Sequence, residues 1–100
     1  MIIIEATARI PHGKWPEARA AMEPMIRASR AEAGCVDYAY SIDLLEPDRL
    51  RVIERWVDMP ALQYHFQTPH MAVFRKALAA LGPVGLELRM YEAEPQDLPL

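Results

Sequence analysis

The chain has 100 residues, which is the length of a single domain. Its net charge is −3 and its eleven basic residues are scattered, which excludes the clustered positive charge that nucleic-acid binding needs. The single cysteine, Cys35, excludes an internal disulfide and any all-cysteine metal site.

The N-terminus has neither the basic start nor the long apolar run of a signal peptide. No segment approaches the roughly 18 apolar residues of a membrane span. We therefore expect a soluble, cytoplasmic protein with no membrane partner.

The first ten residues are β-branched and alternating, which predicts a strand. Pro11, His12 and Gly13 interrupt it, and apolar residues then recur with helical period over residues 14–33. Gly34 follows, where a helix commonly ends in a left-handed residue.

Two further strands are predicted over Cys35–Leu45 and Leu50–Val57, joined by a turn at residues 46–49. Tyr38 and Tyr40 share one face of the first of these strands. The sequence does not show whether Trp56 on the next strand lies on the same face of the sheet. The answer depends on the pairing register of the two strands, because a shift of one residue moves every side chain to the opposite face.

The next segment is helical, and Asp58 is suited to its N-cap. Thr68 and Pro69 interrupt the helix, and Thr68 can cap a second part that runs to about Leu81. Gly82 and Pro83 end this part.

Val84–Glu92 is the fourth strand, so the order is βαββαβ. Short, right-handed connections make this a ferredoxin-like plait of the α+β class, an antiparallel four-stranded sheet with two helices on one face. Residues 1–94 form the domain and residues 95–100 an irregular tail. Two helices cover only one face of the sheet, so we expect a homodimer that buries the other face. We expect the tail to reach across this dimer interface.

His65 is the leading candidate for a reactive group. It follows Leu62 by three residues and precedes Phe66, which places it at the border of the helix's buried side. A histidine between helix and sheet can act as a general base or bind a phenol. The alternative is a core histidine that bonds to a backbone carbonyl.

Glu54 and Trp56 lie two residues apart and therefore share a strand face. If that face meets the helices, Trp56 forms a pocket wall and Glu54 is a carboxylate near His65. The alternative is an aromatic core anchor beside a glutamate paired with an arginine such as Arg9, Arg55 or Arg89.

No metal site is expected. His70 follows His65 by five residues, which is not a one-face helical spacing, and we expect it to be partly exposed. Met22 and Met25 are expected to fill the core, with Met25 as a further candidate for the pocket lining.

Residues 32–71 resemble the antibiotic biosynthesis monooxygenase family of dimeric α/β-barrel proteins. The recurrent pattern is Glu-x-Gly-Cys-x-x-Tyr, an Asp-Pro-type turn, Glu-x-Trp, then Ala-Leu-x-x-His and a second histidine after Ser/Thr-Pro. The matching residues here are Glu32, Gly34, Cys35, Tyr38, Pro47, Asp48, Glu54, Trp56, Ala61, Leu62, His65, Thr68, Pro69 and His70.

This resemblance implies a homodimer with a pocket between sheet and helices in each subunit. It implies a monooxygenase that oxidises a small hydroxylated aromatic (a quinol, an anthrone-like compound or another phenol) with O₂ and without cofactor or metal. His65 would be the base, and the substrate would lie against Trp56, Glu54, Tyr38, Phe66, Phe74 and Met25.

Other members of this fold imply other activities. The haem-degrading branch uses an Asn on the first strand and a Trp and a His on the second helix, where this chain has Ala6, His65 and Arg75, so haem is disfavoured. The remaining alternatives are an isomerase or lyase and a non-catalytic small-molecule-binding dimer.

Overall fold

The computed structural model describes residues 1–100 and contains four strands and three helices. In chain order they are β1 (Ile2–Arg9), α1 (Trp15–Arg30), β2 (Cys35–Ile42), β3 (Arg49–Trp56), α2 (Met59–Phe66), α3 (Pro69–Leu81) and β4 (Val84–Glu92). The predicted order of elements is confirmed, including the division of the second helical region into two parts.

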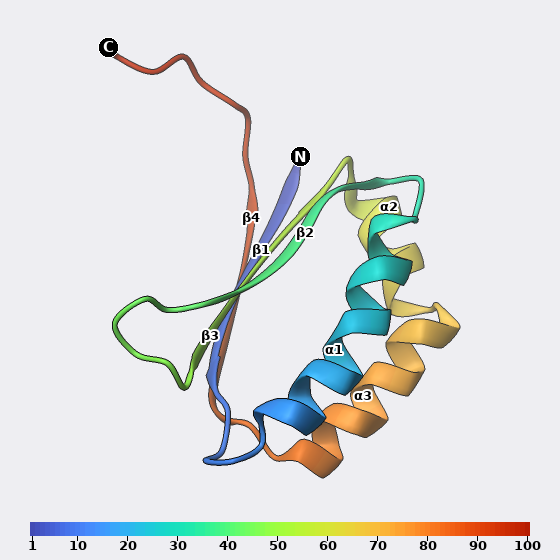
Figure 1. The fold of residues 1–100 in the computed structure, drawn as a ribbon. Helices are drawn as coiled ribbons and strands as arrows, with labels where there is room; N and C mark the ends of the chain where they lie inside the picture. Colours follow the sequence, from blue (N-terminus) through green and yellow to red (C-terminus); the bar gives the residue numbers. More distant parts are fainter.

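The strands form one antiparallel sheet in the order β2-β3-β1-β4. All three helices lie on the same side of this sheet, and the last residues extend away from it (Figure 1). This is the predicted ferredoxin-like plait. None of the helices is long and apolar enough to span a membrane.

The core lies between the sheet and the helices. On β1 the buried residues Ile2, Ala6 and Ala8 alternate with more exposed ones, because successive side chains of a strand point to opposite faces. The helices place their apolar stripes against this face. The largest fully buried hydrophobic side chains are Trp56, Tyr38 and Met25.

Side chains cap both parts of the second helical region, as the sequence predicts. The Asp58 carboxylate accepts the Ala61 N–H at 2.9 Å, and the Thr68 hydroxyl accepts the Met71 N–H at 3.3 Å. Gly82 ends α3 with a φ of 67°. Because both caps satisfy free N–H groups at a helix start, α2 and α3 each begin as a separate helix.

The second strand is shorter than predicted. β2 ends at Ile42, not Leu45, because the Asp43 carboxylate accepts the N–H groups of Leu45 and Glu46 at 2.8 and 3.1 Å and turns the chain. Leu44 is 96% exposed as a result. Its apolar character had suggested a strand residue.

Gly34 has a different role from the predicted one. α1 ends at Arg30, and Gly34 does not have a positive φ. A Cβ atom at this position would overlap the side chain of Ala61. Glycine is therefore needed here because the loop after α1 approaches α2 closely.

We predict that Gly34→Ala lowers the free energy of unfolding by about 1–3 kcal/mol, the usual cost of overpacking. The second substitution Ala61→Gly should restore much of this loss, because it removes the overlapping methyl group. Urea denaturation of the two single variants and the double variant measures the coupling. Additive losses would show that the two positions do not contact one another.

Candidate active site

An apolar cavity of about 320 Å³ lies between the sheet and the helices. Twenty residues line it and sixteen are hydrophobic. α3 covers the cavity with Met71, Phe74 and Leu78. The side formed by β4 is open, because its lining residues Leu86, Leu88 and Met90 are 50%, 66% and 55% exposed.

The register of β2 against β3 brings the polar groups of the cavity together. Tyr38 lies opposite Glu54, and Tyr40 lies opposite Val52. Residues directly opposite in an antiparallel pair point to the same face. All four line the cavity, which settles the register that the sequence left open.

Glu54 carries the carboxyl group of the cavity. Its Oε1 accepts a hydrogen bond of 3.1 Å from the Trp56 indole N–H. Burial raises the pKa of Glu54 to about 7; the bond from Trp56 opposes this shift and the charge of Glu32 adds to it. A carboxyl with this pKa can both accept and return a proton at neutral pH.

Glu54 is not paired with an arginine, contrary to the alternative considered above. Arg55 pairs with Asp37, and Arg89 lies near Glu87. Arg9 pairs with two carboxylates of the β2–β3 loop, Glu46 and Asp48. These partners leave the Glu54 charge without a nearby cation, in agreement with its raised pKa.

Two phenols lie beside this carboxyl. The hydroxyls of Tyr38 and Tyr40 are 3.1 Å apart, and their ring centroids are 5.5 Å apart. Burial raises the pKa of both, that of Tyr40 to about 12, so both are neutral hydrogen-bond donors near pH 7. They can bind an oxygen atom of an aromatic ligand in the cavity.

His65 does not line the cavity but packs against the rings of Trp56 and Tyr38. Its exposed fraction is 1%, and its ring centroid is 4.5 Å from that of Trp56 and 5.6 Å from that of Tyr38. Burial lowers the pKa of His65, and the hydrogen bond to Glu32 opposes the shift. The predicted burial of this side chain is confirmed, but its partner is a carboxylate, not a backbone carbonyl.

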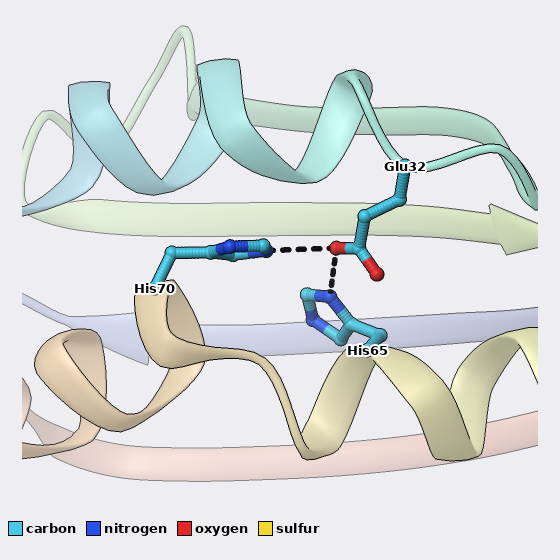
Figure 2. Close-up of side chains that lie close together, drawn as sticks. All are labelled: Glu32, His65 and His70. Atoms are coloured by element: carbon cyan, nitrogen blue, oxygen red, sulfur yellow. Dashed lines mark hydrogen bonds and ion pairs between the residues drawn. The ribbon is translucent and has the colours of Figure 1, made fainter.

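Glu32 joins the two histidines that the sequence treats separately. Its Oε2 lies 2.7 Å from His65 Nδ1 and 2.9 Å from His70 Nε2 (Figure 2). Because an ionised carboxylate only accepts hydrogen bonds, each imidazole presents an N–H to this oxygen. Glu32 Oε1 and His65 Nε2 are buried and have no hydrogen-bond partner.

The structure divides the predicted site residues into two groups. Those that line the cavity are Tyr38, Glu54, Phe66 and Phe74. Those that are buried and do not line it are Met25, Trp56 and His65. Met25 fills the core, and Ser29 Oγ lies 3.6 Å from its sulfur.

Sequence reasoning missed Glu32 and the use of Tyr40. Glu32 follows a helix that ends three residues earlier than predicted, and its place in the Glu-x-Gly-Cys pattern is the only signal in the sequence. For Tyr40 the missing information was the strand register. The spacing argument against a joint role of His65 and His70 fails because α2 ends between them and α3 begins in a new direction.

The plait, with a cavity between its sheet and its helices, defines this chain as a ferredoxin-like α+β protein. The chain belongs to the antibiotic biosynthesis monooxygenase family, whose model matches residues 1–77.

Relatives and solved structures agree with this assignment. Uncharacterised protein sll1783 of Synechocystis sp. is 32% identical over 98 residues, which cover 97% of this chain and 67% of that protein. The Escherichia coli K12 protein named "Probable quinol monooxygenase YgiN" is 34% identical over 55 residues, or 47% of this chain and 53% of its own. A crystal structure from Deinococcus radiodurans superposes with a TM-score of 0.89 at 26% identity and covers 100% of this chain and 99% of its own.

We predict that the Glu54 carboxyl titrates near pH 7 and that its ionisation destabilises the fold. Its folded pKa lies above the ordinary value of 4.5, so the folded state binds more protons than the unfolded state between 4.5 and about 7. Stability should therefore fall as pH rises through this window. Glu54→Gln removes this contribution, and urea denaturation of both proteins across the window measures the difference. Parallel pH profiles would contradict the raised pKa.

Proposed function

We propose that this protein is a cofactor-independent monooxygenase that oxidises a small hydroxylated aromatic, such as a quinol or an anthrone-like compound. One observation carries the proposal: a carboxyl with a pKa of about 7 and two neutral phenols lie together in an otherwise apolar cavity. Family membership supports it. The name of the E. coli relative supports a quinol as the first substrate to test.

The reaction begins with proton transfer. The hydroxyls of Tyr38 and Tyr40 hold an oxygen of the substrate, and the Glu54 carboxylate takes a proton from its acidic O–H or C–H group. The apolar lining keeps water away from the resulting electron-rich anion. Glu54 is the base in this scheme, because it lines the cavity and His65 does not.

The anion then reacts with oxygen. It transfers one electron to O₂, and the superoxide and substrate radical combine to form a carbon–oxygen bond. The proton held by Glu54 protonates the peroxide. For an anthrone-like CH₂ group, loss of the second C–H proton with hydroxide breaks the O–O bond and gives a carbonyl and water. One oxygen atom enters the product and the other enters water.

His65 is proposed as a positioning residue. It packs on Trp56, and the Trp56 indole N–H holds one oxygen of Glu54. The hydrogen bond with Glu32 fixes the imidazole ring in turn. A change at His65 therefore reaches the base through Trp56, without contact with the substrate.

The proposed assembly is a homodimer through the helix-free face of the sheet. Ile3, Ile53 and Tyr91 lie on neighbouring strands of this face, at positions that alternate with the buried ones. β4 is exposed along its whole length, and the tail carries exposed Leu98 and Leu100 beyond it. A partner subunit would bury these apolar side chains, which lie among charged ones such as Glu5 and Arg55 on the same face.

We predict oxygen uptake when a quinol or an anthrone is added to chelator-treated protein. Glu54→Gln should lower kcat/KM by about 100-fold or more, the usual contribution of a general base. The wild-type kcat/KM should rise with pH through about 7, and this rise should be absent from the variant. A Clark electrode with product analysis by mass spectrometry provides the measurement.

The control is Glu87→Gln, an exposed carboxyl on β4, which should keep full activity. Equal activity of wild type and Glu54→Gln would exclude Glu54 as the base. Turnover of the same compounds without oxygen would instead favour an isomerase or lyase. A rise in melting temperature without product would favour a binding protein.

We predict a solution mass of twice 11.4 kDa in sedimentation equilibrium. Ile53→Glu places a charge in the middle of the helix-free face and should yield monomers. Leu44→Glu is the matched control, because Leu44 is 96% exposed and lies in the loop beyond β2. A monomeric wild type, or dimers that persist in Ile53→Glu, would contradict this interface.

A further inference from the structure

We propose that Glu32, His65 and His70 form a binding site for one divalent first-row transition-metal ion, of which Zn²⁺ is the probe. Glu32 follows α1, His65 lies in the last turn of α2 and His70 lies in the first turn of α3; the three side chains converge on one point (Figure 2). None of them lines the cavity, so an ion bound here would not contact the proposed substrate.

The geometry requires only small movements. One ligand atom of each residue lies within 4.8 Å of the others, and the two measured separations are 2.7 and 2.9 Å. Bonds of about 2.0–2.1 Å to a tetrahedral ion place ligand atoms roughly 3.3 Å apart. The separations of 2.7 and 2.9 Å are both a few tenths of an ångström shorter than this value, and both imidazole nitrogens already lie next to the same carboxylate oxygen.

The donor set selects the kind of ion. Two imidazoles and one carboxylate are the ligands of zinc and its neighbours, whereas Mg²⁺ and Ca²⁺ prefer oxygen ligands. Three protein ligands leave the fourth position of a tetrahedral ion for water. The ion would replace the two protons that now lie between the nitrogens and Glu32.

A second observation points to a missing ligand. The Glu32 side chain is only 6% exposed, and its Oε1 has no hydrogen-bond partner. A buried carboxylate oxygen without a donor is costly. An ion held by Oε2 satisfies it, either because Glu32 binds through both oxygens or because the water on the ion donates to Oε1.

An ion can reach the site from outside. His70 is 24% exposed, and a shallow depression between the end of α1 and α2 includes Glu32 in its lining. The bound ion would connect the segment after α1 with α2 and α3. Its expected effect is therefore to stabilise the packing of these helical segments against one another.

The test is calorimetric titration of chelator-treated protein with ZnCl₂ in the absence of substrate. The expected result is one ion per chain, with a rise in melting temperature. His70→Ala and Glu32→Gln should each weaken binding by at least about tenfold, since even outer residues of metal sites contribute this much. Co²⁺ in place of Zn²⁺ should give the visible absorption of a tetrahedral site.

His12→Ala is the matched control, because His12 is an exposed loop histidine away from the cluster. It should bind Zn²⁺ as the wild type does. Failure to bind one ion per chain, or equal binding by wild type, His70→Ala and Glu32→Gln, would overturn the proposal. Neither result depends on oxygen uptake, so the metal site and the proposed oxygenation succeed or fail separately.

Discussion

The position of β3 between β2 and β1 is the constraint on which the site depends. Glu54 lies opposite Tyr38 on one side and Ile4 on the other. This pairing turns the carboxyl, both phenols and the Trp56 ring toward the helices together. A shift of one residue would move all of them to the opposite face and remove the carboxyl and the phenols from the cavity.

Burial shifts the pKa values of two groups in this part of the structure, the Glu54 carboxyl and the His65 imidazole, in opposite directions. It raises the pKa of Glu54 and lowers that of His65, so both groups are held closer to their neutral forms. Their effects on stability oppose one another. Ionisation of Glu54 weakens the fold as pH rises, and protonation of His65 weakens it as pH falls. The two contributions therefore partly cancel one another in acidic solution below the ordinary pKa of histidine.

The sequence predicts the elements well because their signals are local. The caps at Asp58 and Thr68 and the terminating Gly82 act within a few residues, and alternation on β1 follows from one strand alone. The site is harder to predict because its geometry is not local. The register of β2, the convergence of His65 and His70 on Glu32, and the close approach at Gly34 all depend on residues far apart in the chain.

β4 lines one side of the cavity and supplies neither its carboxyl nor its phenols. Leu86, Leu88 and Met90 form its open side, whereas its carboxyl and phenols come from β2 and β3. Side chains on β4 can therefore change in size and shape without disturbing the Glu54 carboxyl. During divergence from a common ancestor, this arrangement lets the shape of the cavity change while its polar groups are retained.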